Sequence, residues 1–285
     1  MIEHLAWVTA RAARGRDEDE PAALDALRRA GVSVDVVDWD DDRVDWSRFD
    51  RVVLRSAWDY PTRLAEFLGW LDRVEAVTDV VNPPAMVRWN LDKSYLAELA
   101  AAGVPTTPTA FLRPGSASEF PAGDFVLKPA VGAGGRDAAW YGPEQHGLAA
   151  RHVERLHAAA RTVLVQPLLA SVAADGEWPM IFLGGKFSHA ANKRVELPRA
   201  GAVDDLFAAE TNTGHLADAA QIEVAAAAVE VVATRFGAPA YARVDLVRDA
   251  AGRCCVLELE LVEPSLFLAH ADPSALDRLV AALTG

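Results

Sequence analysis

Apolar and polar positions alternate along the first part of the chain in a way that predicts strands interleaved with helices. Three short apolar runs predict β-strands: residues 4–9, 32–37 and 51–54. Two segments repeat apolar residues at helical spacing: residues 21–30 and 64–77. The first of these helices stops at Gly31, a residue typical of helix ends. This order predicts a small α/β domain with a parallel sheet.

The remainder of the chain predicts a larger part that is richer in sheet. Strands are expected at 125–129, 163–169, 180–183, 186–190, 241–249 and 256–265, and an extended segment at 104–112. Helices are expected up to Ala102 and over 151–160, 222–236 and 273–283, whereas 199–212 has a weak pattern and is expected to be a loop. Residues 82–84 (Asn-Pro-Pro) mark a boundary. We therefore expect three domains, comprising residues 1–86, 87–168 and 169–285.

The last two strands form a predicted hairpin that carries most of the acidic chemistry. Asp249 to Gly252 supply the turn. Because side chains alternate along a strand, Arg243 and Asp245 share one face, and Glu258 and Glu260 share a face of the next strand. Clustered carboxylates need a cation among them, and oxygen ligands suit Mg²⁺. The alternative is a solvated hairpin face, since exposed sheets also alternate.

Composition narrows the class of protein. The chain has 285 residues, of which 51% are hydrophobic and 24% charged, as in a globular enzyme. The net charge of −13 argues against nucleic acid or an anionic membrane as partner. No apolar run is long enough for a membrane span, and the start lacks signal-peptide features. The two cysteines are adjacent and cannot easily bridge, so we expect a cytoplasmic protein; a homodimer is left open.

Lysine is rare in this chain. Only four of the 28 basic residues are lysines: Lys93, Lys128, Lys186 and Lys193. A lysine that persists against an arginine-rich background is expected where a compact ammonium group is needed.

A glycine-rich loop follows the strand that bears Lys128. Gly132, Gly134 and Gly135 would free backbone N–H groups beside that ammonium group, which together suit an anion such as a phosphate. The alternative is that these glycines form a turn that binds no ligand. The spacing excludes a P-loop, and no Gly-x-Gly-x-x-Gly follows the first strand.

Two further segments allow a structural and a functional interpretation. Gln166, Pro167, Leu168 and Leu169 either end a buried strand or form a hinge whose backbone contacts an adenine ring. The stretch from Arg55 to Tyr60 ends a strand of the predicted parallel sheet, where ligands collect. It is either a turn with a packed Trp or a substrate pocket. The pocket residues would be Arg55, Ser56, Trp58, Asp59 and Tyr60, which suit a small zwitterionic compound.

The ordered set of these residues resembles the ATP-grasp superfamily. The set comprises Lys93, Lys128, the glycine loop, Gln166 to Leu168, Glu177, Lys193, Arg194, Asp245, Glu258 and Glu260. It is most similar to the branch of prokaryotic glutathione synthetase and RimK-type ligases, and to the group that includes the D-cycloserine-forming ligase. The resemblance spans roughly residues 50 to 270. It implies an α/β class fold (α+β in its later part), with an N-terminal α/β domain, a small lid and a C-terminal sheet domain.

The resemblance also implies roles for individual residues. Lys93, Lys128 and the glycine loop would bind ATP phosphates, Gln166 to Leu169 the adenine and Glu177 the ribose. Asp245, Glu258 and Glu260 would hold Mg²⁺, although many relatives have Asn at the last position. Gly132 stands where relatives often carry Ser. Arg243, Lys193 and Arg194 would offset charge during the reaction.

The implied reaction is ATP-dependent ligation. A small carboxylate attacks the γ-phosphate to give an acylphosphate and ADP, and an amine or related nitrogen nucleophile then displaces phosphate. Two alternatives remain: phosphotransfer to a small molecule without ligation, and a nucleotide-binding protein that has lost catalysis. The cofactors would be ATP and Mg²⁺, and the partner a small carboxylate or amine.

Overall fold

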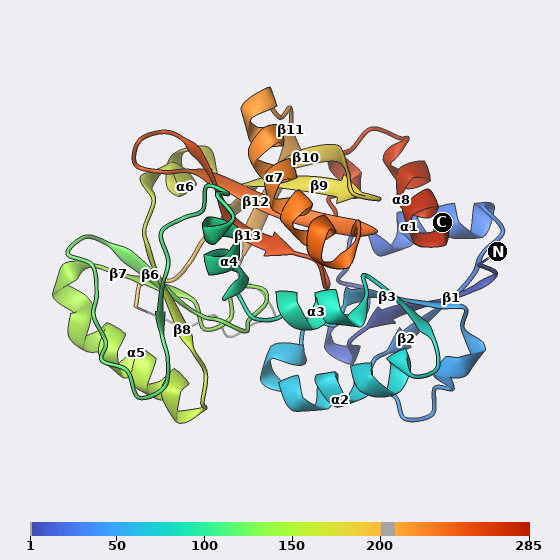
Figure 1. Ribbon diagram of the computed structural model, residues 1–285, viewed down its shortest axis with the longest axis horizontal. Coiled ribbons are helices and arrows are strands. Elements are labelled where there is room, and N and C mark those ends of the chain that lie inside the picture. Colours follow the sequence, from blue (N-terminus) through green and yellow to red (C-terminus); the bar gives the residue numbers. More distant parts are fainter. Residues whose placement is uncertain (1, 201–208) are drawn as a thin grey trace.

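A computed structural model of the protein describes residues 2–200 and 209–285, which form three β-sheets with helices packed against them (Figure 1). The first sheet is parallel, with strand order β2-β1-β3-β4, and confirms the arrangement predicted for the N-terminal part. Its strands are β1 (His4–Thr9), β2 (Ser33–Asp38), β3 (Arg51–Ser56) and β4 (Asp79–Val81).

Both faces of this parallel sheet are covered. Ala6 of β1 belongs to an apolar cluster with α2 (Leu64–Glu75). Trp7, on the opposite face, belongs to a second cluster with α1 (Glu20–Arg29) and α8 (Ala275–Thr284). The helices α1 and α8 contact each other although they lie near opposite ends of the chain (Figure 1). A strand buried on both sides has no solvent-facing positions, which explains the unbroken apolar run in β1.

The second sheet is antiparallel, with strand order β5-β8-β6-β7. It lies with α5 (His146–Ala158) at the left of Figure 1, away from the chain termini. The helix starts at His146 rather than at Arg151 as expected. The strands are β5 (Ala110–Leu112), β6 (Phe125–Pro129), β7 (Ala139–Tyr141) and β8 (Val163–Pro167).

The third sheet is also antiparallel, with strand order β11-β10-β9-β12-β13, and α7 (Ala219–Phe236) packs against it. Two hairpins lie in this sheet: the strands expected over 180–183 and 186–190 form the first, and the second confirms the hairpin predicted for the last two strands. The first turns at Gly184 and Gly185, whose φ angles of 58° and 74° suit glycine. The strands are β9 (Trp178–Leu183), β10 (Lys186–Val195), β11 (Glu210–His215), β12 (Tyr241–Arg248) and β13 (Cys254–Glu260).

The side chain of Asn82 connects the N-terminal part of the chain to the third sheet through hydrogen bonds. Its buried side chain donates to the carbonyl oxygens of Tyr241 (2.8 Å) and Leu261 (2.7 Å) and accepts from the amide of Ala240 (2.8 Å). Its φ of 56° is tolerated by Asn better than by most residues. Asn82, the first residue of the boundary predicted from the sequence, is therefore buried and held by hydrogen bonds to the third sheet.

Some elements differ from expectation. The predicted loop over 199–212 is wrong for its last residues, because β11 begins at Glu210; residues 201–208 lie outside the described part. The helices α3 (Pro84–Asn90) and α6 (Ala170–Asp175) were not expected, whereas α4 (Tyr95–Ala101) was. Helices this short carry little periodicity. Within the described residues, every helix is too short or too polar to span a bilayer.

Candidate active site

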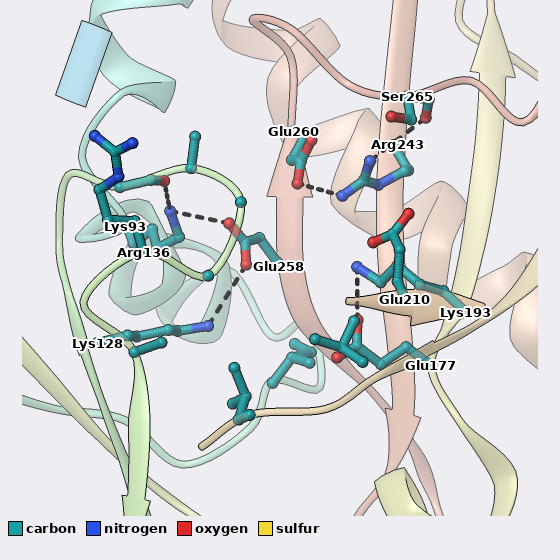
Figure 2. Close-up of a pocket in the computed structure, with 18 of the residues that line it drawn as sticks. Lys93, Lys128, Arg136, Glu177, Lys193, Glu210, Arg243, Glu258, Glu260 and Ser265 are labelled. Atoms are coloured by element: carbon teal, nitrogen blue, oxygen red, sulfur yellow. Dashed lines mark hydrogen bonds and ion pairs between the residues drawn. The ribbon is translucent and has the colours of Figure 1, made fainter. Parts of the chain in front are cut away.

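A cavity of about 900 Å³ lies between the second and third sheets and reaches the end of β3 in the first. Its volume is within the range of ligand-binding cavities. One wall comes from β6, the glycine loop and the end of β8, and the other from β10, β12 and β13. Figure 2 shows charged side chains from the two walls pointing toward one another. The cavity therefore gathers residues that are far apart in sequence.

Glu258 lies between two lysines. Its Oε1 is 2.9 Å from Lys93 Nζ, and its Oε2 is 3.5 Å from Lys128 Nζ (Figure 2). Burial alone would raise the pKa of Glu258, but Lys93 and Lys128 hold it well below its usual range. The carboxylate is thus ionised and offsets one of the two positive charges, so it occupies ammonium groups that would otherwise attract an anionic ligand.

The glycine loop is connected to these charges. Lys93 Nζ donates to the carbonyl oxygen of Gly132 over 2.6 Å. Gly134 and Gly135 have φ angles of 64° and 74°, which favour glycine. All three glycines line the cavity, so the predicted anion loop does lie beside both lysines.

The end of β8 forms the other edge of the same wall. Gln166, Pro167, Leu168 and Leu169 all line the cavity. The amide of Leu168 already donates to the carbonyl oxygen of Asp124 (2.9 Å), and Gln166 Nε2 donates to Thr109 Oγ1 (2.9 Å). Of the backbone amides in this segment, that of Leu168 is therefore not available to a ligand in this geometry.

Lys193 joins two carboxylates on the opposite wall. Its Nζ is 2.8 Å from Glu177 Oε2 and 2.8 Å from Asp245 Oδ2. Burial would lower the pKa of Lys193, but Asp245 and Glu177 raise it above its usual range. Because an ammonium group has three donors, one remains for a ligand.

Arg243 is also paired with Asp245, and with one further carboxylate, that of Glu260. Its Nε is 2.8 Å from Asp245 Oδ1, and its Nη2 is 3.0 Å from Asp245 Oδ2 and also pairs with Glu260 (Figure 2). The strand register places Arg243 opposite Glu260 and Asp245 opposite Glu258. The alternation predicts only that the two residues of each strand share a face. Asp245 is only 1% exposed and lies behind the cavity wall.

The three predicted Mg²⁺ ligands are neighbours, but their carboxylates face different cations. In the described part of the chain, no three acidic, His or Cys side chains converge on one point. Burial raises the pKa of Glu260 to about 7 against the effect of Arg243, and Asp245 and Glu258 add to the rise. Glu258 and Glu260 line the cavity and offer the oxygen donors that Mg²⁺ prefers. The carboxylates of Glu258 and Glu260 could therefore bind Mg²⁺ from the cavity wall. Asp245 could bind the ion only after breaking its hydrogen bonds with Arg243 and Lys193.

Besides Asp245, four of the predicted site residues do not line the cavity. Arg194 follows Lys193 on a strand and points to the other face, where it donates to carbonyl oxygens of α6. Arg55 and Ser56 still belong to β3 and are buried; Ser56 Oγ donates to Thr9 Oγ1 over 2.7 Å. Asp59 accepts from Trp39 Nε1 over 2.8 Å. Trp58 and Tyr60, which come after the strand, do line the cavity.

Sequence reasoning also missed residues that line the cavity: Asp19, Glu263, Ser265 and Phe267 among them. Asp19 lies before α1, and its carboxylate accepts the amides of Leu266 and Leu268. The loop after β13 therefore depends on the N-terminal part of the chain. The Glu-Pro-Ser stretch that follows Glu260 was the available signal, but it carried no periodicity.

Comparison with known proteins bears on this geometry. Residues 5–82 match the family model described as D-cycloserine synthetase DcsG, N-terminal domain. The chain is 41% identical to the cycloserine biosynthesis protein DcsG of Streptomyces lavendulae, with 95% of each chain covered. The crystal structure of D-cycloserine synthetase DcsG matches with a TM-score of 0.90 at 40% identity, over 98% of both chains.

More distant structures share the fold. D-alanine–D-alanine ligase from Bacillus anthracis, complexed with ATP, matches with a TM-score of 0.68 at 14% identity, over 99% of this chain and 96% of that one. An ATP-grasp RimK domain protein from Sphaerobacter thermophilus matches with a TM-score of 0.66 at 17% identity, over 99% and 100%. The predicted ATP-grasp fold is thereby confirmed. With this fold and its identity to DcsG, the chain belongs to the family of DcsG-like ATP-grasp proteins.

Proposed function

We propose that the protein is an ATP-dependent ligase that activates a small carboxylate as an acylphosphate for attack by a nitrogen nucleophile, with release of ADP and phosphate. The observation that carries this proposal is the pairing of Glu258 with Lys93 and Lys128 in a cavity lined by the glycine loop. The membership in a family of ATP-grasp proteins supports it.

In the proposed site, the second sheet would hold ATP. The segment from Gln166 to Leu169 would contact adenine and Glu177 the ribose, while Lys93 and Lys128 would bind phosphate oxygens together with the amides of the glycine loop. The contacts of Lys93 Nζ with the Gly132 carbonyl oxygen and with Glu258 fix the position of its ammonium group. A lysine contributes a compact point charge, which suits phosphate groups that change position during the reaction.

The opposite wall would hold the substrate and the developing charge. Glu258 and Glu260 would bind Mg²⁺, and we retain Asp245 as a ligand only after rearrangement. The ion would supply charge neutralisation at the phosphates. Arg243 Nη1 has only a weak contact, 3.4 Å from the carbonyl oxygen of Ser265, and would stabilise the oxyanion that forms when nitrogen attacks the acyl carbon. Trp58 and Tyr60 would line the substrate site and exclude water, which would otherwise hydrolyse the acylphosphate.

The name of the relative DcsG suggests a substrate class. D-cycloserine is a ring closed through an acyl–nitrogen bond, so the carboxylate and the nitrogen of one molecule would react with each other. For this chain we propose a small amino-acid-like compound of the same kind, and D-cycloserine as a product-like inhibitor.

The test is an ADP-release screen across amino acids, small peptides and ureido or hydroxamate compounds, repeated with hydroxylamine to trap acylphosphates. The proposal expects ADP and free phosphate, and a hydroxamate when hydroxylamine is present. A phosphorylated acceptor without free phosphate would show a phosphotransferase instead. Nucleotide binding without any turnover across the screen would argue for a protein that has lost catalysis.

A further inference from the structure

Glu263 is a buried carboxyl group on the cavity wall that the proposed reaction does not use. It follows β13, is 8% exposed and lines the cavity. Tyr60, which lies just after β3, also lines the cavity, and burial together with the nearby Glu263 carboxyl raises the pKa of its phenol well above the usual value. Trp58 Nε1 donates to the Glu263 carbonyl oxygen over 3.1 Å. The carboxyl group is therefore held in place at the junction of the first and third sheets.

Among the described residues, Glu263 differs from the other carboxylates of this wall in lacking a basic partner. Glu177 pairs with Lys193, Glu258 with Lys93 and Lys128, and Glu260 with Arg243. Over residues 2–200 and 209–285, Glu263 forms no such ion pair. Burial and the nearby carboxylate of Glu260 raise the pKa of Glu263 to about 8. A buried acid of this kind is stabilised in its ionised form by a cation that enters the cavity.

We propose that Glu263 and Tyr60 bind a protonated amine of the substrate, so that the enzyme selects carboxylates that also carry an ammonium group. This inference rests on the proposed function and specifies its substrate class. An ammonium group has three N–H donors, which the Glu263 carboxylate and the Tyr60 phenol oxygen can accept. Charge-assisted hydrogen bonds of this kind are the stronger ones.

The surroundings of the pair favour a cation over a neutral group. The rings of Trp58 and Phe267 also line the cavity, and aromatic faces attract ammonium groups. The guanidinium of Arg243 lies 5.7 Å from the centre of the Phe267 ring. A zwitterionic substrate can therefore place its carboxylate near Arg243 and its ammonium group near Glu263. A substrate with a hydroxyl group instead of the ammonium group would leave Glu263 without a counter-charge.

The test compares ligands that differ only in the ammonium group. Calorimetry on the full chain, loaded with Mg²⁺ and a non-hydrolysable ATP analogue, measures binding without turnover. The probes are alanine against lactate, serine against glycerate, each in both enantiomers, and 4-aminobutanoate against 4-hydroxybutanoate. The wild type should bind at least one amino compound about 10-fold or more tightly than its hydroxy counterpart.

Glu263→Gln retains the shape of the side chain and should reduce that preference about 10-fold, while the ATP analogue binds as before. Tyr60→Phe should reduce it less. Glu210→Gln, the same change at an exposed acid of the cavity rim, should leave the preference intact. Wild-type enzyme that prefers no amino compound, or a Glu263→Gln variant that keeps the preference, overturns the proposal. If Glu263→Gln does not fold, an unchanged preference in Tyr60→Phe overturns it.

Failure of the proposed function gives a different result. In that case the amino compounds bind with the expected preference, but no ADP is released from ATP with any of them, with or without hydroxylamine. Conversely, ADP release that is equally fast with amino and hydroxy compounds supports the ligase and overturns the ammonium site.

Discussion

Replacing Glu258 by Gln should have opposite effects on ATP binding and on turnover. In the unliganded protein the Glu258 carboxylate occupies the two ammonium groups of Lys93 and Lys128. ATP without metal must displace this carboxylate and then lies next to a negative charge. With Mg²⁺ present, the same carboxylate would become a ligand of the ion and would help the reaction.

The magnitude follows from the distances. Glu258 is 2.9 Å and 3.5 Å from the two ammonium nitrogens, so phosphate oxygens bound to these lysines come close to the carboxylate. Two unit charges about 4 Å apart interact by about 4 kcal/mol at an effective dielectric constant of about 20. Since water and ions entering the cavity screen part of this energy, we expect metal-free ATP to bind Glu258→Gln about 10- to 100-fold more tightly than wild type.

The assay measures ATP affinity by calorimetry in EDTA and in Mg²⁺, and measures turnover in Mg²⁺. In EDTA the variant should bind more tightly; in Mg²⁺ its turnover should fall by about 100-fold or more, because charge neutralisation matters most in the transition state. Glu98→Gln, a change at a surface ion pair with Arg235, should alter neither quantity. Weaker binding of the variant in EDTA would refute the idea that Glu258 competes with phosphate.

Three further changes test other parts of the site. Lys128→Ala should weaken ATP binding about 10-fold with little change in kcat, as expected for a contact made equally in ground and transition states; a loss confined to kcat would contradict this. Arg55→Met should raise the KM for substrate and leave the KM for ATP nearly unchanged. Arg55 Nη2 lies 3.6 Å from Asp19 Oδ2, and the Asp19 carboxylate accepts hydrogen bonds from the loop after β13. A rise in the KM for ATP alone would contradict this link to the substrate. Nucleotide binding in Mg²⁺ should strengthen about 10-fold from pH 6 to pH 8, because Glu260, with its pKa raised to about 7, must lose a proton before it can bind the ion. Glu260→Gln should make nucleotide affinity nearly independent of pH over this range. An unchanged pH dependence in this variant would exclude Glu260 as the titrating group.

Most of the few lysines in this chain lie in the cavity, as the arginine-rich composition suggested. Lys93, Lys128 and Lys193 all line the cavity, whereas Lys186 is exposed at the turn of the β9–β10 hairpin. A lysine retained among arginines is expected where a compact ammonium group is needed, and the cavity is such a place; the groups that these lysines bind stay a prediction. The alternation along β12 and β13 likewise placed the acidic residues next to one another.

Only part of the predicted substrate pocket lines the cavity, because β3 is longer than expected. The strand continues through Ser56, so Arg55 and Ser56 lie inside the parallel sheet, where both faces are covered. Arg55 is 1% exposed, beside Asp17 and Asp19. Only residues beyond the end of such a strand can reach a ligand, and the exact end is not visible in an apolar pattern.

The pairing of charges was not predictable from local sequence. Strand alternation suggested that three carboxylates converge, but Glu258 turns to lysines from two other segments of the chain. A bulge between Asp245 and Leu246 further shifts the register. Leu257 is half-buried at the cavity, whereas Leu259 belongs to the apolar cluster of the third sheet. Glu263 was not predicted as a site residue because it follows the strand and belongs to no repeating pattern. These features depend on contacts between distant residues, which only the fold creates.

The most direct test of the proposed ligation is transfer of oxygen from substrate to phosphate. A carboxylate substrate found in the ADP-release screen is labelled with ¹⁸O in its carboxyl group, and the phosphate formed in the presence of nitrogen nucleophile is analysed by mass spectrometry. An acylphosphate intermediate predicts one ¹⁸O atom in each phosphate released, because the bond from carbonyl carbon to the bridging oxygen breaks when nitrogen attacks. Phosphate without label, formed at the same rate as the ligated product, would contradict the account.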